Sequence, residues 1–274
     1  MPGSIPPDPA TAARNEPPVA LRRLLPERGE LTADELVGEL RPWELATPER
    51  PHVAVNMVQT CDGRATVQGR TAPISSLADR QLFHALRTRV DAVMIGAETL
   101  RVERYGRIVP DAARREQRRR SGLRPDPLAI VVSGSLKLSA DLPLLQDPAS
   151  RVVIVTASEH SLDGVRADVE YLRSAPIDLS AVFAQLRSAH GVRAILGEGG
   201  PHLNASLLAR GLIDELFVTT VGVLAGATGA LSIMDGAPLQ APVALSPRWL
   251  LEHEGELFAR YAVGSVAADA PSPA

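Results

Sequence analysis

The stretch VRAILGEGGPHLNASLLARGLIDELFVTTVGV (residues 192–223) contains a complete strand–helix–strand unit. An apolar run at 192–198 predicts a strand, and a glycine-rich turn leads from it into a leucine-rich helix. Gly211 ends this helix, and the β-rich residues from Leu216 onward predict a second strand. Strands that alternate with helices are joined by right-handed crossovers, so this unit predicts a parallel pair of strands in an α/β fold.

The same alternation runs outward from this unit. Short, almost wholly apolar runs are typical of parallel strands covered on both faces, and they recur at 52–58, 91–96, 128–133 and 151–156. Ser76 with Asp79, and also Asp178, give capping signals for helices. The last two apolar runs meet at Glu254-Gly255, which predicts a hairpin. We therefore expect a three-layer α/β sandwich with a mixed, mostly parallel central sheet, helices on both faces and a C-terminal antiparallel hairpin.

Composition divides the chain into four parts. Residues 1–20 are rich in proline and are expected to be a disordered N-terminal extension, and residues 266–274 a disordered tail. Residues 21–50 are expected to form a short helical lead-in, with a helix over Leu31–Leu40 that Thr32 and Glu35 cap. Residues 51–265 form the main domain.

The overall composition excludes several classes of function. A net charge of −3 and an aromatic content of 3% argue against a nucleic-acid-binding protein. The uncharged stretch 216–234 is long enough to cross a membrane, but its β-rich start and glycine-rich remainder favour a buried strand and a loop, so we expect no membrane span. Cys61 is the only cysteine and the histidines are scattered, so we expect no metal site; the single thiol fits a cytoplasmic protein.

Two turns that follow buried strands are candidate phosphate sites. In Gly197-Glu198-Gly199-Gly200-Pro201, glycines allow close approach of an anion and Pro201 suits the first turn of a helix. Free N–H groups at that helix start then favour a phosphate, although the same sequence also suits a plain tight turn. Gly96-Ala97-Glu98-Thr99 allows the same two readings, with Thr99 capping a helix in the second.

Other polar residues also allow a functional and a structural interpretation. Asp62 is either a carboxylate in a cleft or part of an Asp-Gly turn, after Asn56 and Thr60. Ser133 and Ser135, near Lys137, either bind a ribose 2′-phosphate or cap a turn.

Four segments together resemble a known family. They are NMVQTCDGRA (56–65), LRTRVDAVMIGAETL (86–100), LAIVVSGSLKL (128–138) and ILGEGGPHLNASLLARGLIDEL (195–216). In this order they resemble the reductase domain of bacterial riboflavin biosynthesis, over roughly His52 to Val263. The resemblance implies a dihydrofolate reductase-like fold for the domain at 51–265.

The resemblance also implies an activity and a site. It implies an NADPH-dependent 5-amino-6-(5-phosphoribosylamino)uracil reductase that transfers hydride to C1 of the ribosyl group, with a carboxylic acid supplying a proton. Glu198, and after it Asp62, match the catalytic positions. Cofactor positions are matched by Gly96, Thr99, Ser133, Gly197, Gly199, Gly200 and Pro201. Substrate positions are assigned to Asn56, Thr60, Ser75 and Arg87, and Arg87, Arg101 or Arg104 would supply a basic pocket for the sugar phosphate.

Departures from the family pattern lie on the substrate side. Asn56 stands where the family often has lysine, and residues 71–76 and 101–106 replace two further family motifs. A pterin or dihydrofolate reductase on the same fold, with Asp62 facing the ring, is therefore an alternative, as is a catalytically silent NADPH-binding protein. The zinc motifs of the companion deaminase are missing, so we expect a stand-alone reductase, and the resemblance implies a homodimer.

Overall fold

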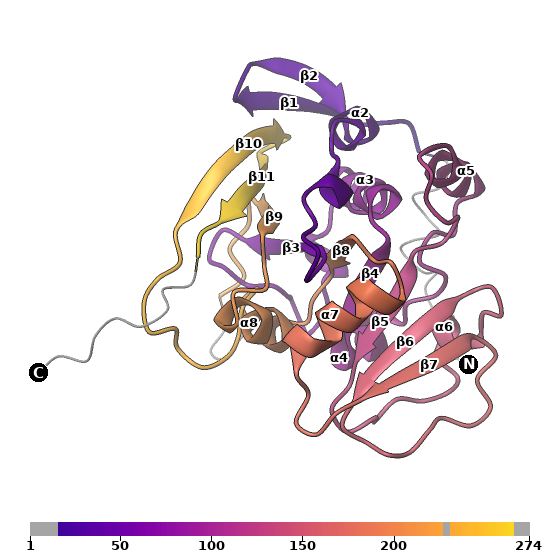
Figure 1. Ribbon diagram of the computed structural model, residues 1–274. Coiled ribbons are helices and arrows are strands. Elements are labelled where there is room, and N and C mark those ends of the chain that lie inside the picture. The colour runs from indigo at the N-terminus through magenta and orange to yellow at the C-terminus, as the bar shows by residue number, and fades with distance from the viewer. Residues whose placement is uncertain (1–15, 227–230, 266–274) are drawn as a thin grey trace, which may run out of the picture.

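The computed structural model describes residues 16–226 and 231–265. These residues form an 11-stranded sheet in the order β2-β1-β10-β11-β9-β3-β8-β4-β5-β6-β7 (Figure 1). The disorder expected for residues 1–20 and 266–274 falls, apart from positions 16–20, outside the described part of the chain.

The strands and helices have the following bounds. The strands are β1 (Ala20–Leu25), β2 (Gly29–Thr32), β3 (His52–Thr60), β4 (Ala92–Gly96), β5 (Leu128–Val132), β6 (Arg151–Thr156), β7 (Asp168–Arg173), β8 (Ala194–Gly197), β9 (Glu215–Val221), β10 (Leu245–His253) and β11 (Glu256–Val263). The α-helices are α2 (Ala33–Gly38), α3 (Leu77–Leu86), α4 (Ala97–Glu103), α5 (Ala112–Arg120), α6 (Pro143–Gln146), α7 (Leu179–Ala189) and α8 (Pro201–Ala209). Short 3₁₀ turns lie at Pro42–Glu44, Ala72–Ile74 and Arg87–Arg89.

The sheet has a parallel part and an antiparallel part. Strands β9, β3, β8, β4, β5, β6 and β7 pair in parallel, whereas β11, β10, β1 and β2 continue the sheet in antiparallel fashion from β9. The expected mixed sheet with a C-terminal hairpin is therefore confirmed. At the hairpin turn Glu254 and Gly255 both have positive φ, at 47° and 82°.

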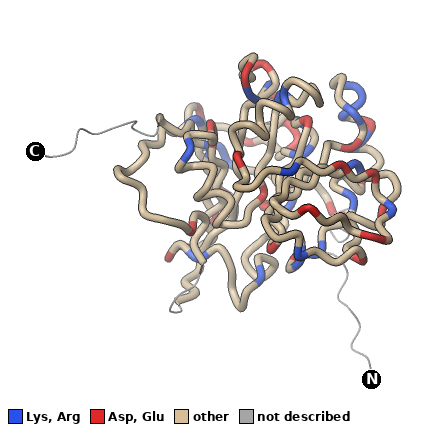
Figure 2. The backbone as a smooth tube through the Cα atoms, turned by 60° about the horizontal axis from the view of Figure 1, so that its bottom comes forward, with Lys and Arg blue, Asp and Glu red and all other residues tan. Residues whose placement is uncertain are grey.

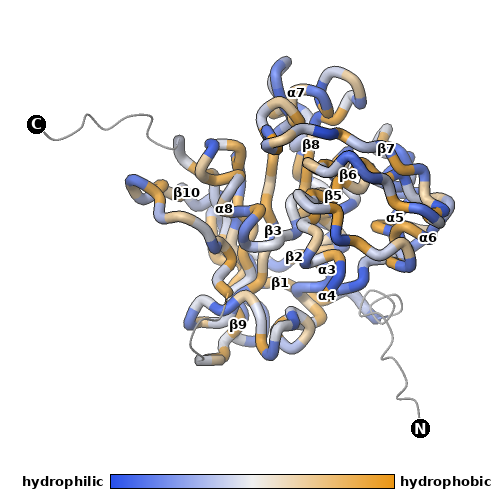
Figure 3. The backbone as a smooth tube through the Cα atoms, turned by 90° about the horizontal axis from the view of Figure 1, so that it is seen from below, coloured by the Kyte–Doolittle hydropathy of each residue, from blue (hydrophilic) through white to orange (hydrophobic). Residues whose placement is uncertain are grey.

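Two apolar layers cover the parallel strands. Along β4, Val93 and Ile95 pack into one cluster with α2, α3 and α4, while Ala92 and Met94 pack into the other with α7 and α8. Successive strand residues point to opposite faces, which is why a strand buried on both sides has an unbroken apolar sequence. Hydrophobic colour accordingly gathers along the central strands in Figure 3, and hydrophilic colour on outer helices and loops.

The predicted helix starts are confirmed. Thr32 and Glu35 form a complete capping box at α2, Ser76 accepts from the Asp79 N–H at α3, and Asp178 caps α7. The charged stretch at 111–120 contains five arginines. It is the helix α5, but its Arg118 is fully buried rather than solvated.

The lead-in and one edge strand differ from the expectation. Besides its predicted helix, the lead-in at 21–50 contains the strands β1 and β2, and β1 pairs with β10. Strand β7, which the sequence analysis missed, pairs with β6 at the other edge of the sheet. Strands β1 and β7 alternate polar and apolar residues irregularly, so their pairing is decided by distant partners rather than by local pattern.

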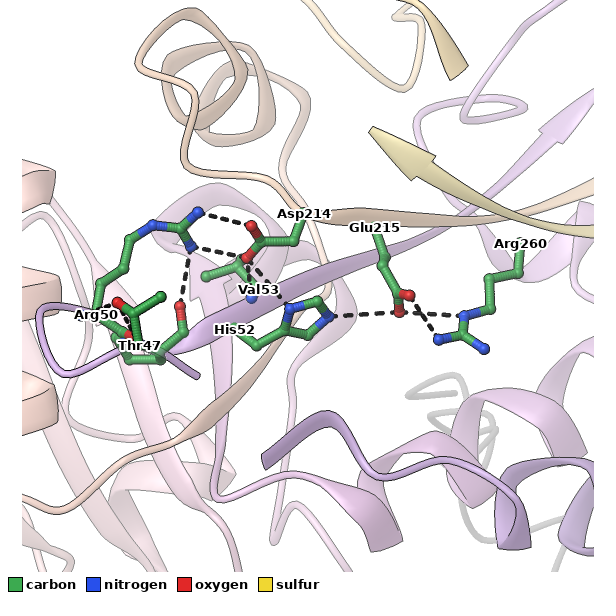
Figure 4. A network of polar contacts seen from close by, with 8 residues as sticks. Thr47, Arg50, His52, Val53, Asp214, Glu215 and Arg260 are labelled. Atoms are coloured by element: carbon green, nitrogen blue, oxygen red, sulfur yellow. Dashed lines mark hydrogen bonds and ion pairs between the residues drawn. The ribbon is translucent and has the colours of Figure 1, made fainter. Parts of the chain in front are cut away.

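A network of charged groups fastens the starts of β3 and β9 to β11 (Figure 4). Arg50 donates to both oxygens of Asp214, at 2.7 and 2.6 Å, and His52 lies 3.5 Å from Asp214 and 3.5 Å from Glu215. Arg260 donates twice to Glu215. Burial opposes ionisation of Glu215, but hydrogen bonds from His52 and Arg260 hold its pKa below the usual range. The network lies at the amino ends of these parallel strands, away from the end where their carboxyl termini meet.

Charge and hydropathy agree with the composition. Basic and acidic residues are interspersed along the chain in Figure 2, and no face of one sign is visible in that view. None of the described helices is long and apolar enough to cross a membrane. The uncharged stretch at 216–234 begins as strand β9 and continues as a loop, of which residues 227–230 lie outside the described part.

Candidate active site

Two adjoining cavities open at the carboxyl ends of the parallel strands. The larger, of about 540 Å³, lies over the ends of β4, β5 and β8 and the start of α8. The smaller, of about 170 Å³, lies between β3, α3 and the segment after α4. Both are lined by Met57, Ala65, Thr71, Thr99, Glu103 and Glu198. We call these six residues the shared wall. Ligands in the two cavities would therefore meet along it.

The two predicted glycine turns form a single cradle in the larger cavity. Gly96 N–H donates to the Gly199 carbonyl at 2.8 Å, and a Cβ built on Gly96 would lie 3.0 Å from the Gly200 nitrogen. Gly199 has φ +92°, which favours glycine, and a Cβ on Gly200 would lie 3.1 Å from the Thr99 hydroxyl. Gly197 is equally confined, because its Cβ would lie 3.2 Å from the Val55 side chain. A side chain at any of these four glycines would thus be crowded by its neighbours or strained.

The cradle also presents the N-terminus of α8. Helix α8 begins at Pro201, and its N-cap Gly200 makes no side-chain capping bond. Uncapped N–H groups at a helix start favour an anion. The other end of the larger cavity is lined by Ser133, Ser135 and the exposed Lys137. The residues present therefore fit an elongated ligand with phosphate groups, as a nicotinamide dinucleotide is.

Glu198 lies on the shared wall in a buried ion pair. Its two oxygens accept from Arg87 Nε and Nη2, both at 2.7 Å, and the two side chains are 1% and 4% exposed. The Arg87 guanidinium packs over the Phe83 ring at 4.1 Å and the Tyr105 ring at 5.2 Å. Burial opposes the charge of Arg87, but Glu198 outweighs it and raises the arginine pKa, so the guanidinium stays charged. The geometry fixes the carboxylate in one orientation at the meeting point of the cavities.

The fully buried Arg118 binds the backbone next to this ion pair. It donates to the Arg87 carbonyl at 2.5 Å and to the Val90 carbonyl at 2.8 Å. Burial lowers its pKa to about 10, which still leaves the guanidinium charged near neutral pH. The Arg118 guanidinium of α5 thereby fixes the backbone that carries Arg87.

Asp62 and Thr60 lie apart from the cavities. The sequence places both residues in the site, but neither lines the larger or the smaller cavity. The Thr60 hydroxyl donates to Asp62 at 2.5 Å, and the carboxylate accepts from the N–H groups of Ala225 and Gly226 at 3.2 and 2.8 Å. These bonds, the Thr60 bond first, lower the Asp62 pKa to about 2. Such a group is ionised near neutral pH and ties down the loop after β9, so it has no proton to donate there.

The other expected residues divide between the two cavities. The larger is lined by Gly96, Thr99, Ser133, Gly199, Gly200 and Pro201, and the smaller by Asn56, Ser75 and Arg87. Of the three arginines expected to bind the sugar phosphate, Arg87 is committed to Glu198, Arg101 lines the larger cavity and pairs with Glu98, and Arg104 lines neither. The arginines of the smaller cavity, besides Arg87, are Arg80 and Arg107.

The sequence predicts Asp79 only as part of a helix cap. In the structure Asp79 lines the smaller cavity, is 5% exposed and accepts a hydrogen bond from the Ser75 hydroxyl at 2.6 Å. Burial raises its pKa. The sequence signal for this role was Ser-Ser-x-x-Asp at 75–79. In this pattern the Asp79 carboxylate can bond to Ser75, which precedes the N-cap Ser76, instead of closing a capping box. Within the described residues no cluster of metal-ligating side chains is present.

Comparisons with known proteins show the family and the fold of the chain. The family model for the RibD C-terminal domain matches residues 51–254. A 2,5-diamino-6-ribosylamino-4(3H)-pyrimidinone 5′-phosphate reductase from Archaeoglobus fulgidus is 30% identical, over 68% of this chain and 87% of its own. The reductase of the same name from Kluyveromyces lactis is 27% identical, over 71% and 84%. A pyrimidine reductase-like structure from Corynebacterium diphtheriae has a TM-score of 0.72 at 23% identity, over 85% of this chain and 99% of that one, which shows a common fold.

Proposed function

Because the chain belongs to the RibD C-terminal domain family, we propose that it is an NADPH-dependent reductase of a ribosylaminopyrimidine 5′-phosphate. One observation carries the proposal. The larger cavity, which contains the cradle, and the smaller cavity have the shared wall in common. A nicotinamide bound in the larger cavity would therefore face a sugar bound in the smaller one. Hydride transfer requires this close approach of two ligands.

The larger cavity is the proposed cofactor site. The backbone around Gly96, Gly199 and Gly200, with the start of α8, would hold the diphosphate. Ser133, Ser135 and Lys137 would face the 2′-phosphate that distinguishes NADPH from NADH. When bound, the cofactor supplies the hydride.

Glu198 is the proposed proton-transfer group. In the reaction the bond from C1 of the ribosyl group to its ring oxygen breaks, hydride adds to C1 and the ring oxygen takes a proton. Glu198 is the ionisable side chain that lies deepest on the shared wall, and Arg87 holds it in place. Arg80 remains in the smaller cavity to face the sugar phosphate, whereas Arg107 in the same cavity is paired with Asp126. We assign no proton-transfer role to Asp62.

The decisive experiment follows NADPH absorbance with the purified protein. We expect oxidation with the ribosylaminopyrimidine phosphate and none with dihydrofolate. Turnover of dihydrofolate alone would favour the pterin reductase alternative, and NADPH binding without turnover of either substrate would favour a silent binder.

Assembly and location belong to the same proposal. A homodimer is expected, and the exposed Val223 and Leu224 after β9 would suit its interface. Light scattering that gives the mass of a monomer would contradict the dimer. We place the protein in the cytoplasm, which the free Cys61 supports and which fractionation of the cells would test.

A further inference from the structure

We infer that the carboxylate of Asp79 recognises the pyrimidine ring of the substrate and selects a ring with an amino group at C2 over its 2-oxo counterpart. The inference rests on the proposed function, because it concerns the substrate of the same cavity. It assigns a specificity-determining role to a residue outside the expected site.

The position of Asp79 fits recognition of a ligand. Asp79 lies in the first turn of α3, where the helix dipole favours a negative charge. Its backbone N–H is used by the Ser76 cap, and its Oδ2 accepts from the Ser75 hydroxyl. The side chain is thus held in one orientation at the lining of the smaller cavity. A fixed carboxylate in a small cavity is the arrangement that gives orientation and specificity to a bound ring.

Asp79 is a buried carboxylate of the smaller cavity, whereas Glu103, which also lines it, is half-buried and accepts from the Thr71 N–H. Glu198 is neutralised by Arg87, and Arg107 by Asp126, through two hydrogen bonds each. In the described part of the chain, no ion pair includes Asp79, and Arg80 on the same helix acts on it only from a distance. The hydroxyls of Ser75 and Thr219 offset part of the cost of burying this carboxylate, and a bound group that donates further hydrogen bonds would offset more.

The chemistry of the ring decides what that group is. A 2-amino-4(3H)-pyrimidinone presents two adjacent donors, the N3–H and the 2-amino group, and a carboxylate can accept from both at once. In the 2-oxo ring the N3–H lies between two carbonyl oxygens. One of these oxygens would face the Asp79 carboxylate, and two acceptors repel each other. The carboxylate therefore favours the amino ring.

The shared wall argues against a different role for Asp79. Hydride transfer takes place where the two cavities meet, and Asp79 lines only the smaller one. A proton donor for the ring oxygen released from C1 would have to reach that wall, as Glu198 does. Asp79 accordingly acts at the end of the substrate that does not react.

The test compares two substrates with NADPH in excess. One is 2,5-diamino-6-ribosylamino-4(3H)-pyrimidinone 5′-phosphate, and the other is 5-amino-6-(5-phosphoribosylamino)uracil. We expect the unmodified protein to have a higher kcat/KM on the diamino substrate. Asp79→Asn should lower kcat/KM on this substrate by about 10- to 100-fold, because a charge-assisted pair of hydrogen bonds is lost. On the 2-oxo substrate the same variant should keep or raise kcat/KM, because an amide can donate to the ring carbonyl that the carboxylate repels.

A matched control uses a neighbouring carboxyl group. Glu256 accepts from the Ser76 hydroxyl at 2.6 Å and lines neither cavity, so Glu256→Gln should keep the preference for the diamino substrate. The pH profile is a second readout. With the diamino substrate, kcat/KM should fall as pH drops through the raised Asp79 pKa, and this limb should vanish in Asp79→Asn. Arg80 and Glu256 interact electrostatically with Asp79, and both remain in that variant.

The outcomes separate the two proposals. Turnover of both substrates with a preference for the 2-oxo ring, or equal losses on both in Asp79→Asn, would overturn the role of Asp79 and leave the reductase intact. The preference of the unmodified protein is measured without any variant, so a folding defect in Asp79→Asn does not remove the test. Turnover of neither substrate would overturn the proposed function itself and this inference with it.

Discussion

At the scale of the residue, the Arg87–Glu198 pair connects stability with activity. Both side chains are almost completely buried, so removing one partner leaves an uncompensated charge. We predict that Arg87→Met lowers the free energy of unfolding by about 3–5 kcal/mol, measured by urea denaturation. Glu198→Gln should also reduce kcat strongly, with little change in the dissociation constant of NADPH. A Glu198→Gln protein with normal kcat would contradict its proposed proton transfer.

At the scale of the element, the cradle depends on the close approach of two turns. A methyl group on Gly96 would press on the Gly200 backbone at 3.0 Å, and backbone cannot move aside as a flexible side chain can. We predict that Gly96→Ala raises the dissociation constant of NADPH by about tenfold, or ~1.4 kcal/mol, measured by fluorescence titration. Gly38→Ala is the matched control, because nothing lies within 4 Å of its added Cβ. Equal affinity in both variants would show that the cradle does not hold the cofactor.

At the scale of the whole molecule, the lead-in is part of the sheet. Leu21 on β1 is 1% exposed and belongs to the large apolar cluster, whereas its neighbour Arg22 is largely exposed and pairs with Glu252 on β10. We predict that Leu21→Ala lowers the free energy of unfolding by about 2–5 kcal/mol. Arg22→Ala should cost less than about 1 kcal/mol, since exposed ion pairs contribute little. Both free energies of unfolding are measured by chemical denaturation. Similar small losses in both variants would indicate that β1 adds nothing to the core.

The strands and helix starts that depend on local patterns could be predicted from the sequence. Unbroken apolar runs such as 91–96 predicted the parallel strands, and Thr32 and Ser76 predicted helix starts. Hydrophobic periodicity and helix capping both depend on only a few neighbouring residues. The pairing of β1 with β10 depends on residues far apart in the chain, so nothing local announced it. The partner of Glu198 was missed for the same reason, because Arg87 is 111 residues away.

The shared wall has a consequence for inhibitor design. Met57, Thr99 and Glu198 border both cavities, so no layer of protein separates the two binding sites there. A single compound that joins a nicotinamide mimic to a pyrimidine mimic across this wall would lose the entropy of association once instead of twice. Its second half would bind at the high effective concentration that a short linker provides.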